Sequence, residues 1–211
     1  MSHLSLTKDG PPATKQEIVA LLVEEKLSTN HVRDKAGARG LAVHDAFETW
    51  CATGNKPDPS IFPDEERGYV EGLNAFLDDV NPEPYAAEVM VGSVEHGFAG
   101  RYDARLCIEK ECQVVYHRTP VRGPKYATLK QGVLLCDLKT SKGTYMESHG
   151  RQLEAYELAS VECGYDPTTA RGILHVNADG GYELVRSICT GQDFLDVLQV
   201  WRGNVRIKGG K

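Results

Sequence analysis

Two short stretches of this sequence combine carboxylates with a lysine in an order that suits metal-assisted chemistry on a phosphate ester. Asp103 closes the stretch Gly100-Arg101-Tyr102-Asp103, and Asp137 and Lys139 stand two residues apart at the polar end of the apolar run 133–138. In a strand, residues i and i+2 point to the same face, so this carboxylate and this ammonium would enter one cleft while Leu138 faces the core. Carboxylates hold hard divalent cations, and an ammonium beside them can orient a water or neutralise developing charge. The three charged side chains therefore predict a divalent-metal centre.

The elements that would carry these residues change character after residue 82. Before it, apolar residues recur at helical spacing over 15–26, 36–51 and 64–79, with a loop rich in Gly and Pro over 52–63. After it, the pattern predicts strands over 85–93, 98–108, 113–117 and 133–138, with an insertion loop over 118–131. A helix over 145–163, strands over 170–177 and 182–189 and a last helix over 192–201 follow. This order predicts an α/β (α+β) fold with a mixed central sheet flanked by helices, in a single domain over 15–211 after a flexible segment over 1–14.

Four separated motifs resemble those of RecB-type nucleases in the PD-(D/E)XK superfamily, which includes phage exonucleases and CRISPR-associated RecB-like nucleases. Gly100-x-x-Asp103 is followed by Asp137-x-Lys139-Thr140 and then by Gln152-x-x-x-Tyr156, in the family's order and spacing. Upstream, Arg39-Gly40 followed by His44 and Glu48 is similar to the family's first motif. The resemblance covers residues 44–189 and implies a restriction-endonuclease-like core with a nuclease site.

The resemblance also implies which residues bind the metal. His44, Asp103 and Asp137 would hold one or two Mg²⁺ or Mn²⁺ ions, with the backbone carbonyl of Leu138 as a further ligand. Glu88, in the strand before the Gly-x-x-Asp motif, stands where the family often has a glutamate, and we expect a supporting role for it at best. These assignments predict a centre built from residues far apart in the sequence.

The same resemblance assigns the remaining catalytic and DNA-binding residues. Lys139 would be the catalytic lysine that orients the attacking water, and Gln152 and Tyr156 would reach the scissile phosphate or the metal-bound water from one face of their helix. The residues expected to contact DNA phosphates are Arg101, Arg118, Arg122, Lys125, Lys142 and Arg151. The implied function is a metal-dependent deoxyribonuclease, more in keeping with an exonuclease than an endonuclease. It would act on single strands or duplex ends in DNA recombination, repair or phage genome processing.

Each assignment has an ordinary structural alternative, and two other functions stay open. A lone helical histidine such as His44 is more often a structural residue than a ligand, Tyr156 could be a core aromatic, and Asp103 could end a hairpin. His44-Asp45 is also the dipeptide of HD-type metal phosphohydrolases, although that fold is all-helical and the strand pattern speaks against it. A nuclease-like protein that binds DNA ends without cleaving them is the remaining alternative.

Composition and charge set further limits. The 211-residue chain has a formal net charge of −6, yet Lys and Arg outnumber Asp and Glu between Arg101 and Arg151, where the predicted centre lies. That distribution favours a site that binds metal and phosphate together. The six cysteines form no C-x-x-C pair, so we expect free thiols and no iron–sulfur cluster.

The sequence also bears on partners and location. No G-x-x-x-x-G-K-[ST] loop is present, so a helicase or recombinase partner would have to supply any unwinding. A signal-peptide pattern and an apolar stretch of the roughly 20 residues that a membrane span needs are both missing. We therefore expect a cytoplasmic protein, in the host cytoplasm if it is phage-encoded.

Overall fold

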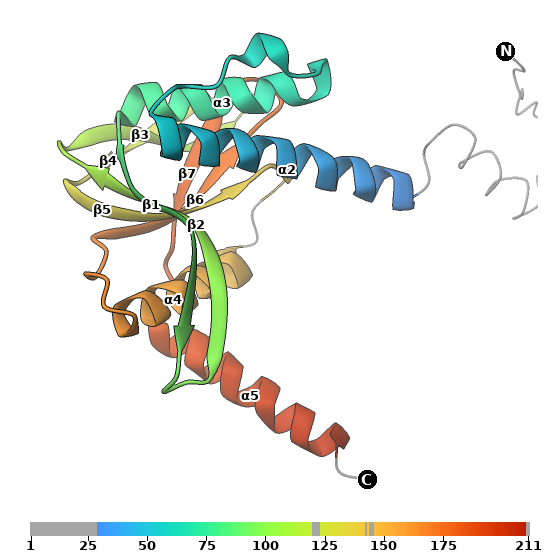
Figure 1. The fold of residues 1–211 in the computed structure, drawn as a ribbon, viewed down its shortest axis with the longest axis vertical. Helices are drawn as coiled ribbons and strands as arrows, with labels where there is room; N and C mark the ends of the chain where they lie inside the picture. The colour runs from blue at the N-terminus through green and yellow to red at the C-terminus, as the bar shows by residue number, and fades with distance from the viewer. Residues whose placement is uncertain (1–28, 120–122, 142, 144–145, 210–211) are drawn as a thin grey trace, which may run out of the picture. The chain divides into compact units, whose positions relative to one another are not determined.

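The computed structural model describes residues 29–119, 123–141, 143 and 146–209, which form an α+β fold (Figure 1). The helices are α2 (Thr29–Thr53), the short 3-10 helix η1 (Pro59–Ile61), α3 (Asp64–Val80), α4 (Met146–Glu162) and α5 (Gly191–Gly209). The strands are β1 (Glu83–Ser93), β2 (Phe98–Ile108), β3 (Cys112–Thr119), β4 (Gly123–Leu129), β5 (Gly132–Lys139), β6 (Ala170–Val176) and β7 (Tyr182–Arg186). The predicted fold class, a mixed sheet flanked by helices, is confirmed.

The chain divides into two compact units, residues 1–38 and 39–211. All residues of the candidate site lie in the second unit, to which the following description is confined. The predicted helix over 15–26 and the predicted flexible segment over 1–14 lie outside the described residues, and a single domain over 15–211 stays a prediction. In the described part of the chain, no helix is both long and apolar enough to cross a membrane.

Five strands form one mixed sheet in the order β1-β2-β5-β6-β7. β5 and β6 are parallel, whereas the other neighbouring pairs are antiparallel. A parallel pair needs a crossover connection, which here contains α4. β5 is central and almost wholly buried, which explains its continuous apolar run up to Asp137. The end of β5 that carries Asp137 and Lys139 therefore lies in the middle of the sheet, with two strands on either side.

Helices cover the two faces of this sheet (Figure 1). On one face, Phe47 of α2 and Leu73 of α3 belong to a core with strand residues that include Leu138. On the other, Leu153 of α4 packs with Leu135 and other strand residues in a second core. The apolar stripes that predicted these helices are therefore the faces that they bury against the sheet.

Two glycines allow α3 to lie directly on the turn between β6 and β7. Gly68 and Gly72 are four residues apart and so lie on one face of the helix. A Cβ added at Gly68 would lie 2.0 Å from the carbonyl oxygen of Ala178, and one at Gly72 would lie 2.5 Å from that of Gly181. Both distances are too short for any real Cβ, so only glycine at these two positions allows α3 to pack this closely against the turn.

One predicted loop proves to be a strand. The insertion loop expected over 118–131 is wrong for residues 123–129, which form β4 and pair with β3 in a separate two-stranded sheet. β4 begins at Gly123-Pro124, a composition typical of a turn. A local sequence pattern cannot show that this segment forms hydrogen bonds with β3. The helix expected over 36–51 starts earlier, at Thr29, and the last helix continues past 201 to Gly209. The remaining elements agree with the predicted ranges to within a few residues.

Candidate metal centre

The centre forms where β2 and β5 separate. Their antiparallel pairing ends at Ala104 opposite Cys136, so the backbone of Leu138 lies beyond the last ladder pair. The side chain of Asp103 takes the place of a strand partner, because Oδ2 accepts a hydrogen bond from the Leu138 backbone N–H at 2.6 Å. The Leu138 carbonyl oxygen lies 3.1 Å from Nε2 of His44 on α2. Three elements, α2, β2 and β5, thus meet at the polar end of β5.

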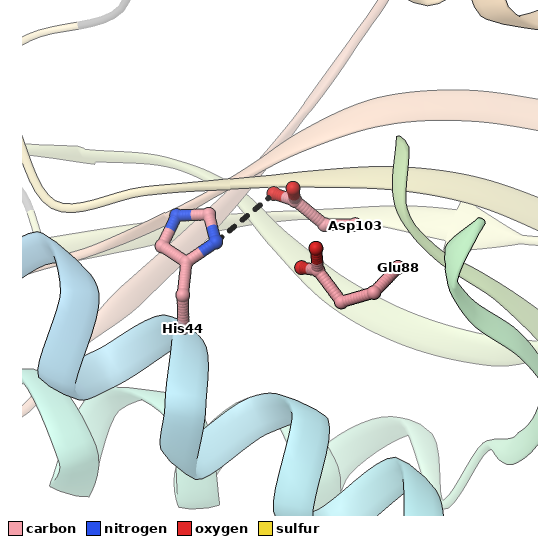
Figure 2. A group of neighbouring side chains, drawn as sticks. All are labelled: His44, Glu88 and Asp103. Carbon is pink, nitrogen blue, oxygen red and sulfur yellow. Dashed lines mark ion pairs between the residues drawn. The ribbon is translucent and has the colours of Figure 1, made fainter. Parts of the chain in front are cut away.

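Glu88 of β1 completes a group that could hold a metal ion. One ligand atom from each of His44, Glu88 and Asp103 lies within 4.8 Å of the other two. Figure 2 shows the three side chains converging from α2, β1 and β2. Nδ1 of His44 is 3.6 Å from Oδ2 of Asp103. Ligands about 2.1 Å from a six-coordinate ion lie about 3.0 Å apart when adjacent and about 4.2 Å when opposite, so small shifts would fit this group around one ion.

The backbone and the charge of Glu88 are both unusual for a strand residue. The pairs Ala87 with Ala104 and Val89 with Tyr102 place Glu88 directly opposite Asp103. Like charges facing each other across a hairpin destabilise it. Glu88 also has a φ of 51°, in the left-handed region that a glutamate seldom occupies. A cation shared by the two carboxylates would offset their repulsion.

The sequence predicts only a supporting role for Glu88, and the structure places its carboxylate among the three side chains that could hold a metal ion. The sequence could have identified Glu88 through the predicted turn around Glu95-His96-Gly97, because this turn fixes which residues of β1 and β2 lie opposite each other. Ser93 pairs with Phe98 across that turn. Counting back along both strands from this pair brings residue 88 opposite residue 103.

Asp137 and Lys139 meet on one face of β5, as the spacing predicts. Nζ of Lys139 lies 2.5 Å from Oδ2 of Asp137, whose side chain is only 3% exposed. Leu138, between them, is fully buried in the opposite core. Burial lowers the pKa of Lys139, but the charge and hydrogen bond of Asp137 outweigh it and raise the pKa overall. The ammonium therefore stays charged at neutral pH.

Burial and neighbouring charges shift the pKa values of Asp103 and His44, whose side chains face each other. Burial, with the charge of Asp137, raises the pKa of Asp103 to about 7. Burial and the charge of Lys139 lower the pKa of His44, which keeps its imidazole neutral at neutral pH, the form that binds metals. The Leu138 carbonyl can only accept, so Nε2 of His44 carries the proton when the two are hydrogen-bonded. The lone pair of Nδ1 then faces Asp103, an arrangement that a cation would stabilise.

The raised pKa of Asp103 predicts that its charge destabilises the protein when no metal is bound. Relative to an unfolded-state pKa of about 3.9, ionisation costs the folded state its full penalty above pH 7, less as the pH falls towards 4, and nothing below. Asp103→Asn keeps an acceptor for the Leu138 N–H and removes the charge. We expect it to raise the free energy of unfolding in EDTA at pH 8 by about 1–3 kcal/mol, a gain that shrinks towards pH 4.5.

Urea unfolding at both pH values measures this difference. Asp45→Asn is the matched control because Asp45 is exposed on the same helix as His44, and we expect a change below about 0.5 kcal/mol. An Asp103→Asn protein less stable than the wild type at pH 8 would contradict the assignment of an unfavourable buried charge.

Gln152 and Tyr156 lie side by side on α4, next to the carboxylates. Nε2 of Gln152 donates to the Tyr156 hydroxyl at 2.7 Å. Burial raises the pKa of Tyr156, and the charges of Asp137 and Asp103 add to the shift. A Cβ added at Gly100 would lie 2.6 Å from Cε1 of the Tyr156 ring. The glycine of the Gly-x-x-Asp motif therefore makes room for this tyrosine over β2.

A buried ionic network holds α4 in this position. Arg105 of β2, whose side chain is 0% exposed, lies 3.7 Å from Glu157, and Nε of Arg171 lies 2.7 Å from Oε1 of Glu154. Glu154 and Glu157 belong to α4, so the network links the helix to β2 through the fully buried Arg105 and to β6 through Arg171, which is 30% exposed. No sequence pattern identifies these four residues, since charged side chains are ordinarily expected at the surface.

The predicted phosphate contacts are spread over several elements. Arg101 is 62% exposed, and its Nε lies 2.9 Å from Oε2 of Glu88. The Arg118 guanidinium instead pairs with Asp179 in the turn between β6 and β7, at 3.0 Å. Lys125 is exposed on β4, and Arg151 is half-buried on α4. Arg122 and Lys142 lie outside the described residues. Of the predicted contacts that the structure describes, Arg101 is the one that touches the ligand group.

The His44-Asp45 dipeptide does not act as a pair. His44 joins the ligand group, whereas Asp45 is exposed and outside it.

Neither a scan against family models nor a search of curated proteins finds a match to this chain. The function must therefore be inferred from the residues of the centre and their geometry.

Proposed function

We propose that this protein is a divalent-metal-dependent deoxyribonuclease of the RecB type that hydrolyses phosphodiester bonds, acting as an exonuclease in the cytoplasm. The observation that carries the proposal is the convergence of His44, Glu88 and Asp103 beside the ion pair of Asp137 and Lys139. These residues come from α2, β1, β2 and β5. Together with the Leu138 carbonyl, they include every group that the resemblance assigned to metal binding or to the catalytic lysine. Recombination, repair and phage genome processing are the processes in which such an activity would serve.

The donor set suits Mg²⁺ or Mn²⁺. Carboxylates are the preferred ligands of both ions, and a neutral imidazole is acceptable to Mn²⁺ in particular. Asp103 lies opposite Glu88 in the hairpin, and burial, with the charge of Asp137, raises its pKa, so a cation would stabilise its ionised form. His44, Glu88 and Asp103 would hold the ion, and Asp137 as a further ligand stays a prediction. When bound, the ion would polarise the scissile phosphate and stabilise the charge that develops on its oxygens.

The chain's own groups would orient the substrate and stabilise the transition state. The Lys139 ammonium is fixed by Asp137 and 25% exposed, so it can donate to the attacking water or to a phosphate oxygen. The Tyr156 hydroxyl accepts from Gln152, which directs its own proton elsewhere, towards a phosphate oxygen in this proposal. Both donors are held in place before the substrate binds, which is the condition for effective electrostatic catalysis.

The test is cleavage of end-labelled single- and double-stranded DNA with Mg²⁺ or Mn²⁺, with EDTA and Asp137→Ala as controls. We expect degradation that EDTA abolishes and that falls by about 10³-fold or more in Asp137→Ala, since residues that act as a unit lose most of the rate together. The ladder of products gives the polarity and distinguishes exonuclease from endonuclease. If the folded wild type binds DNA but cleaves it with neither ion, the protein is a DNA-end-binding protein instead.

A further inference from the structure

Arg101 makes the closest charged contact to the ligand group from the solvent side. Its Nε lies 2.9 Å from Oε2 of Glu88, whose side chain is 16% exposed, whereas the Arg101 side chain is 62% exposed. Arg101 pairs with Met90 across the hairpin, close to the facing pair of Glu88 and Asp103. The guanidinium therefore neutralises Glu88 from the rim of the centre.

This ion pair competes with a metal ion for Glu88. The carboxylate that Arg101 holds belongs to one of the three residues whose ligand atoms lie within 4.8 Å of one another. A positive charge beside a ligand carboxylate opposes a divalent cation at the same carboxylate. Because the Arg101 side chain is 62% exposed, the dielectric constant of water, about 80, applies to this repulsion, which then corresponds to roughly a tenfold loss of metal affinity.

Arg101 is also placed to bind a phosphate. A guanidinium binds a phosphate through parallel N–H donors, and exposure on the rim lets one approach. Two other arginines close to β5 and β2 are engaged differently: Arg39 donates to the Thr140 carbonyl at 3.3 Å, and Arg105 is buried. A phosphate that draws Arg101 away from Glu88 would leave that carboxylate to the metal ion.

We propose that Arg101 exchanges between Glu88 and a DNA phosphate and thereby couples metal binding to DNA binding. DNA raises the affinity of the centre for its ion, and the ion raises the affinity for DNA by the same factor, because such coupling is reciprocal. The centre therefore loads its ion preferentially when the substrate is present. This inference rests on the proposed function, since it takes the ligand group as a metal site and DNA as the substrate.

The first experiment measures Mn²⁺ binding without DNA, from the EPR signal of the free ion. We expect Arg101→Met to bind Mn²⁺ about tenfold more tightly than the wild type. Arg186→Met is the matched control, because Arg186 is an exposed arginine on β7, at the opposite edge of the sheet from β1. It loses the same charge and should stay within twofold of the wild type. In a Glu88→Gln background, adding Arg101→Met should change the affinity by less than twofold, because without the Glu88 carboxylate the exposed guanidinium is no longer held beside the ion.

The second experiment repeats the titration with a single-stranded phosphorothioate oligonucleotide, checked on a gel for integrity. DNA should raise the Mn²⁺ affinity more in the wild type than in Arg101→Met, by about the factor that this variant gained without DNA. An unchanged affinity in Arg101→Met, or an increase that persists with Glu88→Gln, overturns the coupling while leaving the metal centre intact. If the wild type and all variants fail to bind Mn²⁺, the proposed metal centre falls, and the coupling with it.

Discussion

Lys139→Met is expected to lower the rate of DNA cleavage by about 10²–10³-fold, the usual cost of removing one preorganised donor from a charge-stabilising site. Methionine keeps the length and apolar stem of lysine and removes the ammonium. In the wild type that ammonium lies 2.5 Å from Asp137, which fixes its direction, and 25% of the side chain is exposed to solvent. Its loss removes the fixed positive charge on β5 that, in the proposed mechanism, would face the scissile phosphate.

Single-turnover cleavage at saturating Mg²⁺ measures this effect, with DNA binding recorded in parallel. Lys130→Met is the control, because Lys130 is exposed in the short connection before β5, and we expect its rate to stay within threefold of the wild type. Arginine at 139 keeps the charge but changes its shape, so it should recover only part of the rate. A Lys139→Met enzyme that cleaves within tenfold of the wild type would remove Lys139 from the mechanism.

Stability can be separated from catalysis at the same pair. Lys139→Met leaves the Asp137 carboxylate buried without its ion pair, which ordinarily costs about 3–5 kcal/mol. Adding Asp137→Asn removes that charge and should restore much of the lost stability without restoring cleavage. Recovery of the rate along with stability would mean that the single variant was merely unfolded.

Gly68→Ala is expected to give the largest loss of stability from a single added methyl group. Alanine in a helix interior is normally better than glycine by about 1 kcal/mol. At position 68 the new Cβ would lie 2.0 Å from the Ala178 carbonyl oxygen, which belongs to backbone and cannot rotate away. Overpacking costs about 1–3 kcal/mol and occasionally more; because backbone must move here we expect a cost of about 3–5 kcal/mol, which leaves a net loss of about 2–4 kcal/mol after the gain from alanine.

Thermal unfolding followed by circular dichroism checks the sign. For a chain of this size the loss corresponds to a fall in Tm of about 4–16 °C. Gly203→Ala on α5 is the matched control, since nothing lies within 4 Å of a Cβ built there, and it should stabilise the protein by about 0.5–1 kcal/mol. Equal effects of the two substitutions would show that α3 does not pack on the turn as described.

The parts of this protein that could be predicted from its sequence are those that depend on local periodicity. Asp137 and Lys139 share a face because side chains alternate along a strand, and a strand buried on both faces reads as an apolar run wherever it lies. The glycine at position 100 could be recognised as part of a motif. Its physical reason, the Tyr156 ring over β2, needs a contact between residues 56 positions apart in the chain.

The features that could not be predicted from the sequence depend on how strands distant in the chain pair and where they separate. The role of Glu88 follows from hairpin register, and the hydrogen bond from Leu138 to Asp103 follows from the point at which β2 leaves β5. Arg105 is buried although arginine ordinarily lies at the surface. The sequence could not predict this burial, because the partner of Arg105, Glu157 on α4, is known only from the folded structure. A strand such as β4, which begins at Gly123-Pro124, is likewise defined by its partner rather than by its own composition.

The left-handed backbone of Glu88 has a consequence for engineering this protein. Glycine or asparagine would occupy a φ of 51° at lower conformational cost than glutamate, so a search for stabilising substitutions guided by backbone geometry would choose position 88 early. The resulting protein should melt at a higher temperature and lose one carboxylate of the centre. If the proposed metal centre is correct, selection for robust folding and selection for metal binding act in opposite directions at this position, and a glutamate retained in natural relatives of this chain would be a sign of a retained centre.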